Sequence, residues 1–218
     1  MAKVGVILAG CGVYDGSEIH EAVITLLALD RADAQVVCMA PNAEQMHVIN
    51  HISGEVMADE NRNILVESAR IARGDITDIS NVSAVDIDAL VIPGGFGAAK
   101  NLCDFAVSGA DCKANTEVAR LVKDMVAANK PIAAICIAPA LLARILGDSN
   151  PQLTIGNDAD TAGGMAAMGA QHIICPVSEY VVDEKLKLVS TPAYMLAGSI
   201  REAAEGIEKT VQALLNLI

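Results

Sequence analysis

Cys136 is the residue whose neighbours most favour chemistry. It ends a strand-like apolar run and stands between small residues in the segment Ala134-Ile-Cys-Ile-Ala138. A nucleophile elbow needs this arrangement, because a tight strand-to-helix turn crowds the backbone. Pro139 suits the first turn of a helix, where backbone N–H groups and the helix dipole lower a thiol pKa. The pattern predicts a nucleophilic thiol, with an inert cysteine at the end of a buried strand as the alternative.

A glycine-rich segment, Pro93-Gly-Gly-Phe-Gly97, follows another apolar run. Its glycines permit positive φ and let a backbone N–H face a ligand. The amide of Gly95, together with that of Ile137, could form a two-donor oxyanion hole. The alternative is a plain flexible turn. The segment lacks the Gly-Lys-Ser/Thr of a phosphate-binding loop.

Two carboxylates, Glu18 and Glu21, stand one turn apart near the start of an expected helix. Carboxylates in a first turn commonly serve capping and the helix dipole. Asp15 and Glu18 have capping-box spacing, and Ser17 is the other candidate N-cap. A carboxyl beside a thiolate would differ, because its pKa would rise and it could carry a proton.

A dinucleotide site is the other chemistry that the glycines suggest. Gly10–Gly16 joins the first expected strand to the first helix, but its glycine spacing is one residue too long for G-x-G-x-x-G. The second expected strand ends in Met39-Ala40-Pro41, with no acidic residue to hold a ribose hydroxyl. We expect no nicotinamide cofactor, and no other cofactor is predicted.

The cysteines do not predict a metal site. They contain no CxxC pair and no histidine-rich neighbourhood, so the ligand spacing of a structural zinc site is missing. Most lie in apolar runs, as reduced core thiols of a cytosolic protein do. The six are Cys11, Cys38, Cys103, Cys112, Cys136 and Cys175.

The elements that must position these residues alternate between strand and helix, which indicates βαβ units and a mainly parallel sheet. The expected strands are Lys3–Gly10, Ala34–Ala40, Asp88–Pro93, Pro131–Cys136, Leu153–Gly156, His172–Val177, Tyr180–Asp183 and Leu186–Thr191. The expected helices are Glu18–Arg31, Asn61–Ala72, Asn115–Ala128, Cys136–Leu146 and Ser199–Leu217. The segment Asn42–Ile79 is more polar and resembles an insertion. We predict one doubly wound domain, residues 1–218, with its site at the carboxyl ends of the parallel strands.

Composition excludes several classes of partner. The net charge is −12 and only 2% of the residues are aromatic, which disfavours nucleic-acid binding. The longest apolar stretches, such as Pro131–Leu142, are shorter than the roughly 20 residues of a membrane span. The N-terminus shows no signal-peptide cleavage region, so we expect no membrane association and a cytoplasmic location.

Four segments together resemble the PfpI/Parkinsonism-associated deglycase superfamily of the class I glutamine amidotransferase-like fold. They are GCGVYDGSEIHEA (Gly10–Ala22), PGGFGAAKNL (Pro93–Leu102), ICIAPALLA (Ile135–Ala143) and TPAYM (Thr191–Met195). In detail the chain is similar, over essentially its whole length, to the ElbB-like branch, the enhancing-lycopene-biosynthesis or sigma cross-reacting proteins. This resemblance implies a flavodoxin-like fold, with a mainly parallel sheet sandwiched between helices.

The resemblance also implies roles for two residues. Cys136 corresponds to the reactive cysteine, and alignment of the first helix through Asp30-Arg-Ala puts the acidic partner on Glu21 rather than Glu18. The sequence departs from the family's hydrolases at the position after the cysteine, where a histidine of the proteases is replaced by Ile137. The late His-x-Glu pair of the glutaminases is also missing, so protease or glutaminase activity is not expected.

The resemblance therefore implies a cofactor-independent glyoxalase that converts glyoxal to glycolate with Cys136 as nucleophile and Glu21 as proton relay. The alternative is a non-enzymatic redox-sensing or regulatory protein that uses the same thiol. The branch is linked by name to isoprenoid biosynthesis, but no aspartate-rich diphosphate site supports that chemistry. We expect a small aldehyde substrate and, from the frequency of such assemblies, a homodimer.

Overall fold

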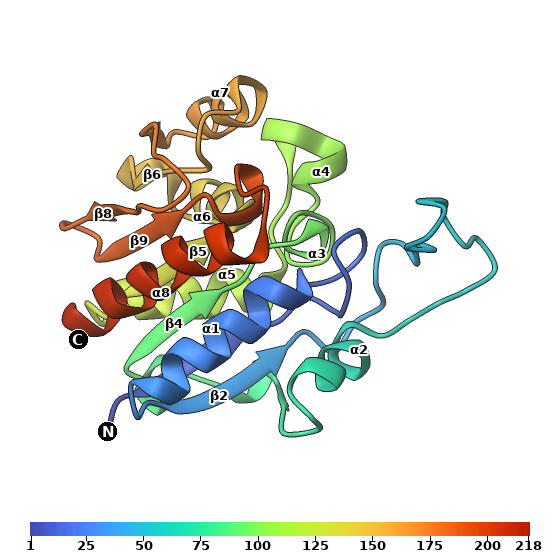
Figure 1. The fold of residues 1–218 in the computed structure, drawn as a ribbon, viewed down its shortest axis with the longest axis horizontal. Helices are drawn as coiled ribbons and strands as arrows, with labels where there is room; N and C mark the ends of the chain where they lie inside the picture. The colour runs from blue at the N-terminus through green and yellow to red at the C-terminus, as the bar shows by residue number, and fades with distance from the viewer.

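The computed structural model describes residues 1–218 and is built around a seven-stranded sheet (Figure 1). Every pairing in the sheet is parallel except that of the last two strands in spatial order. That order is β3 (Thr77–Asp78), β2 (Gln35–Ala40), β1 (Lys3–Ile7), β4 (Ala89–Ile92), β5 (Ile132–Ile135), β9 (Leu188–Thr191) and β8 (Val181–Asp183). The predicted flavodoxin-like, doubly wound fold class is confirmed.

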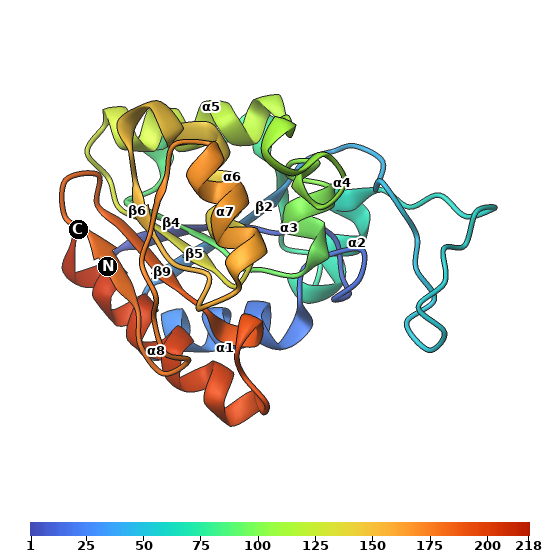
Figure 2. The ribbon, with the colours of Figure 1, turned by 90° about the horizontal axis from the view of Figure 1, so that it is seen from above.

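Helices cover both faces of the sheet (Figure 2). α1 (Ile19–Arg31) and α8 (Ile200–Asn216) cover one face, and α5 (Thr116–Ala127) and α6 (Ala138–Leu146) cover the other. Each face has its own apolar core, because successive strand residues point to opposite sides. The central strands are buried on both faces, which explains their unbroken apolar sequences.

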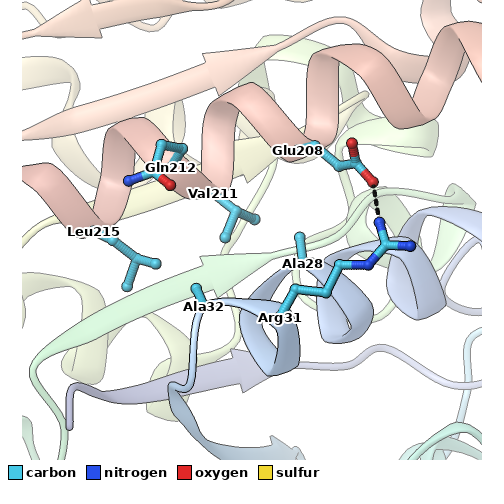
Figure 3. Close-up of a pocket in the computed structure, with 7 residues that line it drawn as sticks. All are labelled: Ala28, Arg31, Ala32, Glu208, Val211, Gln212 and Leu215. Atoms are coloured by element: carbon cyan, nitrogen blue, oxygen red, sulfur yellow. Dashed lines mark hydrogen bonds and ion pairs between the residues drawn. The ribbon is translucent and has the colours of Figure 1, made fainter.

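α1 and α8 pack side by side, and a shallow hollow of about 210 Å³ lies between them (Figure 3). Ala28 and Val211 form its apolar floor, and Arg31 pairs with Glu208 across it at 2.9 Å. No nucleophilic side chain lines this hollow. It is a feature of helix packing, away from the reactive cysteine.

The segment between β2 and β3 forms the predicted insertion, which extends away from the sheet in Figure 1. Its helix, α2 (Ile64–Ile71), is shorter than the expected Asn61–Ala72, because Asn63 is its N-cap and accepts the Val66 N–H. No helix of the structure has the length and hydrophobicity that crossing a bilayer requires.

The region after α6 differs most from the prediction. The expected strands Leu153–Gly156 and His172–Val177 are reduced to β6 (Gln152–Leu153) and β7 (Gln171–His172), a separate parallel pair. Gly156, at φ +95°, turns the chain away from the direction of β6. The Cys175 N–H donates to the Gly156 carbonyl at 3.4 Å, but the pairing of β6 and β7 does not extend to these residues. The first run is apolar because it is buried without pairing along its length, whereas the second is mostly at the surface, with Cys175 buried and Ile174 77% exposed.

Three helices in this fold were not predicted: α3 (Phe96–Lys100), α4 (Phe105–Ser108) and α7 (Ala159–Ala167). The first two are too short to show a helical period. The third contains Gly163 and Gly164, buries only Met165, and so has neither the propensity nor the apolar face that marks a helix. Asp158 starts it by accepting the Thr161 N–H at 2.8 Å.

Candidate active site

Cys136 lies at the turn between β5 and α6. Its φ is +62°, in the left-handed region that non-glycine residues seldom adopt. Its backbone N–H donates to the Thr191 carbonyl at 2.9 Å, which ties the turn to β9. Ala134 and Ala138 on either side are fully buried, and Pro139 lies in the first turn of α6. The structure thus shows the strained elbow geometry that the spacing of small residues predicts.

The loop after β4 approaches this elbow so closely that only glycine fits. A Cβ on Gly94 would lie 2.4 Å from the Cys136 Cβ and 2.6 Å from Glu21 Oε2. Gly95, at φ +93°, has the same constraint, since a Cβ there would lie 2.3 Å from the Glu18 nitrogen. The glycines therefore serve close packing of the loop against Cys136 and α1.

The two amides predicted to form an oxyanion hole point toward the thiol. The backbone amides of Gly95 and Ile137 lie beside the Cys136 sulfur and lower the pKa of the thiol. A negatively charged oxygen on a carbon bonded to the Cys136 sulfur could accept hydrogen bonds from the same two amides. Gly95 and Ile137 line the same pocket as Cys136, and their role as an oxyanion hole stays a prediction.

Glu21 is buried against Cys136. Gly94 N–H donates to Glu21 Oε2 at 3.0 Å, and Tyr194 N–H donates to Oε1 at 3.2 Å. The carboxyl also shares a hydrogen bond with the Cys136 thiol. Burial, followed by the charge of Glu18, raises the pKa of Glu21 to about 8, although these hydrogen bonds lower it. Glu21 therefore carries a proton at neutral pH.

The lowered thiol pKa predicted from the helix N-terminus is wrong. Burial raises the pKa of Cys136 well above its ordinary value, and the charge of an ionised Glu21 raises it further. Hydrogen bonds from the Gly95 and Ile137 amides lower this pKa but do not outweigh burial. The pair therefore holds both protons at neutral pH, so the thiol needs a proton acceptor when it reacts.

Glu18 has a different position from Glu21. It caps α1, with Oε2 accepting the Glu21 N–H at 2.7 Å, while Oε1 lies 3.8 Å from His20 Nδ1. The same His20 nitrogen is 2.8 Å from the hydroxyl of Tyr194. Of the two acidic candidates left open by the residues alone, Glu21 is the one in contact with Cys136.

The predicted N-caps of this helix, Asp15 and Ser17, are wrong, and the reason is tertiary. Ser17 Oγ accepts the Ala9 N–H at 2.8 Å, and Asp15 Oδ2 accepts the Ile49 N–H at 2.7 Å. Both side chains join the loop to other segments instead of capping the helix. Glu18 is therefore left as the cap.

A pocket of about 390 Å³, which we call the reactive pocket, has the buried Cys136 in its wall. Its lining is mainly apolar, with Glu18, Thr161 and Tyr194 as polar residues and no histidine. The full lining is Val13, Glu18, Gly95, Phe96, Cys136, Ile137, Thr161, Tyr194 and Met195. Sequence reasoning missed Tyr194 and Thr161; the only signal for Tyr194 was its place directly after a buried strand, in the Thr191–Met195 segment.

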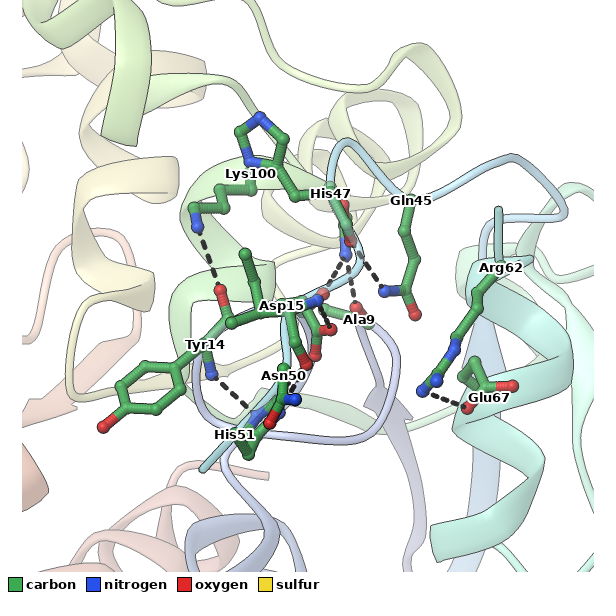
Figure 4. Close-up of polar contacts among 12 residues, drawn as sticks. Ala9, Tyr14, Asp15, Gln45, His47, Asn50, His51, Arg62, Glu67 and Lys100 are labelled. Atoms are coloured by element: carbon green, nitrogen blue, oxygen red, sulfur yellow. Dashed lines mark hydrogen bonds and ion pairs between the residues drawn. The ribbon is translucent and has the colours of Figure 1, made fainter. Parts of the chain in front are cut away.

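The insertion holds the loop that carries Val13 into this pocket (Figure 4). His51 Nε2 accepts the Tyr14 N–H at 3.2 Å, and Lys100 Nζ donates to the Tyr14 carbonyl at 2.9 Å. Asn101 connects three segments, donating to the carbonyls of Ala9 and Asp15 and accepting the Met46 N–H.

The glycine-rich loop considered as a dinucleotide site packs against protein instead. A Cβ on Gly10 would lie 2.8 Å from Gln45 Oε1, and Gly97 N–H donates to the Gly16 carbonyl at 2.8 Å. All six cysteines are free thiols, and no three His, Cys, Asp or Glu side chains are grouped as they would be to hold a metal ion.

Comparison with proteins of known sequence finds close relatives. The chain is 48% identical to the human glutamine amidotransferase-like class 1 domain-containing protein 3, mitochondrial, over 99% of this chain and 83% of that protein. It is 37% identical to the mitochondrial ES1 protein of Danio rerio, over 88% of this chain and 77% of that one.

Comparison with solved structures agrees. An isoprenoid biosynthesis protein with an amidotransferase-like domain from Ehrlichia chaffeensis is 40% identical, with a TM-score of 0.93 over 100% of this chain and 99% of that one. A DJ-1 superfamily protein of Agrobacterium tumefaciens, 19% identical with a TM-score of 0.57 over 98% of this chain and 91% of that one, shares the fold.

The family comparison covers the elements that build the site. Residues 7–190 match the DJ-1/PfpI family, a range that includes Glu21, the glycine loop and Cys136. The resemblance read from the four sequence segments is thereby confirmed. The chain belongs to the DJ-1/PfpI family.

Proposed function

We propose that this protein is a cofactor-independent glyoxalase that converts glyoxal and water to glycolate. The observation that carries the proposal is the buried pair of Cys136 and a protonated Glu21, placed beside two backbone donors and an open pocket. A nucleophile, a proton carrier and an oxyanion site are the groups that an aldehyde isomerisation through a thioester requires.

The chemistry proceeds by addition, isomerisation and hydrolysis. The Cys136 sulfur bonds one aldehyde carbon, and Glu21 passes the thiol proton to the oxygen, which gives a hemithioacetal. A proton then leaves that carbon and another adds to the second carbon through an enediolate, with Glu21 as the carrier, while the hydroxyl proton of the first carbon passes to the oxygen of the second. The first carbon is oxidised to a thioester and the second is reduced to an alcohol. Water cleaves the thioester, releasing glycolate and the thiol.

The backbone donors act on the oxygen of the reacting carbon. The amides of Gly95 and Ile137 stabilise the negative charge of the addition and enediolate steps. The mainly apolar lining strengthens these hydrogen bonds, because the effective dielectric constant there is low. Amide hydrolysis is not proposed, since no histidine lines the pocket to protonate a leaving amine.

The test is turnover of glyoxal and methylglyoxal by wild type, Cys136→Ala and Glu21→Gln. Cys136→Ala should abolish glycolate formation, and Glu21→Gln should lower kcat by about 10²- to 10⁴-fold, the usual contribution of acid–base catalysis. Glu208→Gln, which alters only the exposed Arg31–Glu208 ion pair, is the matched control. Glycolate formation by Cys136→Ala would rule out the mechanism.

A redox sensor remains the competing function, and the thiol's environment disfavours it. Sensor cysteines are exposed and have a low pKa, whereas Cys136 is buried and its pKa is raised. Mass spectrometry after mild peroxide treatment separates the two functions. Selective oxidation of Cys136 without aldehyde turnover would support the sensor and contradict the glyoxalase.

Location and assembly stay predictions from the sequence. We propose a cytoplasmic protein that forms a homodimer; the human and Danio rerio relatives are named as mitochondrial proteins. Size-exclusion chromatography with light scattering measures the assembly, and a mass of one chain would contradict the dimer.

A further inference from the structure

A second hollow, of about 450 Å³ and open to solvent, lies against the reactive pocket, and we call it the side chamber. The two cavities share three wall residues, Phe96, Ile137 and Thr161. The far wall of the side chamber is apolar and comes from α4 and its flanks, through Phe105, Ala106 and Val107. The reactive thiol therefore stands beside a second, larger space.

The combined space is far larger than glyoxal requires. Glyoxal has only two carbons and two oxygens, whereas pockets of some 300–1,000 Å³ typically hold drug-sized ligands. Two large apolar side chains in the wall of the side chamber are exposed to solvent: Phe96 is 46% exposed and Val107 is 66% exposed. Both would be covered by an apolar group that reached from the thiol into the side chamber.

The charges around the two cavities are of one sign. Glu18 lines the reactive pocket and Asp160 lines the side chamber, while no Lys, Arg or His lines either cavity. The ammonium of Lys100 lies 5.2 Å from the Phe96 ring centroid and donates to the Tyr14 carbonyl. A carboxylate or phosphate on the substrate would meet two acidic groups and no cation.

We propose that the side chamber is the substituent subsite of the enzyme, and that the substrate class is uncharged 2-oxoaldehydes with an apolar or aromatic substituent. The proposal rests on the proposed function for the aldehyde reaction itself. The aldehyde carbon bonds Cys136, and the substituent passes Phe96 and Thr161 into the chamber. Anionic aldehydes are excluded by the carboxyl groups.

The first experiment compares kcat/KM for phenylglyoxal and glyoxal. Burial of a ring of phenylalanine size should favour phenylglyoxal by about 10- to 100-fold. Ala106→Trp fills the chamber from an exposed position on α4 and should lower the ratio of the two kcat/KM values toward one. Val85→Trp, at a residue that is 87% exposed and lines neither cavity, should leave the ratio unchanged.

The second experiment needs no turnover and so separates the subsite from the proposed reaction. Iodoacetamide, its N-benzyl derivative and iodoacetate each alkylate Cys136, forming an S–C bond and releasing iodide and a proton. Peptide mass spectrometry measures the rate at Cys136, relative to the rate with a small free thiol. The benzyl reagent should react about tenfold faster than iodoacetamide and iodoacetate about tenfold slower, a factor worth about 1.4 kcal/mol.

Two variants test whether the benzyl preference comes from the side chamber and whether the discrimination against iodoacetate comes from Glu18. Ala106→Trp should remove the benzyl advantage, and Glu18→Gln should narrow the gap between iodoacetamide and iodoacetate. A benzyl preference without turnover of any aldehyde would overturn the glyoxalase and keep the subsite. Turnover of glyoxal without a preference for phenylglyoxal or the benzyl reagent would overturn the subsite alone, as would a chamber that is blocked by a second copy of the chain.

Discussion

Cys136 and Glu21 form one titrating unit. Each lies in the other's field, and each has its pKa raised first by burial. When Glu21 ionises, its charge opposes the formation of a thiolate beside it. The neutral carboxyl of Glu21 can therefore carry a proton for the thiol, whereas a permanently ionised Glu21 would disfavour the thiolate of Cys136.

This coupling predicts opposite effects of one substitution on thiol ionisation and on turnover. Glu21→Gln removes the anion and keeps an oxygen that can accept the Gly94 N–H, so the midpoint of Cys136 alkylation should move to lower pH. Turnover should fall, because the proton relay is lost. The measurement is the alkylation rate of Cys136 against pH, with Glu208→Gln as control. A midpoint that rises or stays constant would show that Glu21 does not act on the thiol.

At the scale of elements, the site depends on how closely three turns approach one another. The turn after β4 meets the elbow after β5 and the start of α1, and Glu18 N–H donates to the Gly94 carbonyl at 2.9 Å. This contact lies at the carboxyl ends of β1 and β4, where the strand order reverses, as expected for doubly wound sheets. Glycine at the contact is a packing requirement.

Two glycine-to-alanine substitutions should have opposite effects on the free energy of unfolding. Gly94→Ala places a Cβ against Cys136 and Glu21 and should destabilise the fold by about 1–3 kcal/mol, with loss of activity. Gly163→Ala, in α7, meets no atom within 4 Å and should stabilise by about 0.5–1 kcal/mol. Urea denaturation measures both. Equal effects of the two changes would contradict the close approach at Gly94.

For the whole molecule, burial of Glu21 makes stability depend on pH. Its folded pKa of about 8 lies above its ordinary value of 4.5, so the unfolded chain ionises first as the pH rises. The stabilising contribution of this group is complete below its unfolded pKa and is lost as the pH rises through the folded pKa.

We predict that the difference in unfolding free energy between wild type and Glu21→Gln changes steadily as the pH rises. Wild type should lose on the order of a few kcal/mol of unfolding free energy between pH 5 and about pH 8 that the variant keeps. The measurement is urea denaturation across this range, and Glu208→Gln, at an exposed ion pair, should follow wild type. Parallel curves for wild type and Glu21→Gln would mean that Glu21 is not buried in its neutral form.

The central strands of the sheet, the alternation of strand and helix, and the elbow at Cys136 were predictable from the sequence, whereas the edge strand β3 and the pair β6 and β7 were not. Unbroken apolar runs such as Ala89–Ile92 mark strands buried on both faces, and small residues around a cysteine before a proline mark a tight strand-to-helix turn. These patterns are local, because each depends only on the types of neighbouring residues in one segment.

Only the tertiary structure decided the protonation of the thiol, the cap of α1 and the space beside the elbow. The spacing around Cys136 predicts a lowered pKa, but the burial that reverses this comes from α1 and the β4 turn. Asp15 and Ser17 have the residue types of caps, yet partners distant in sequence bind them. Tyr194, Phe96 and Thr161 meet at the thiol from three separate segments. Spacing along the chain carries no information on such contacts, since packing between elements determines them.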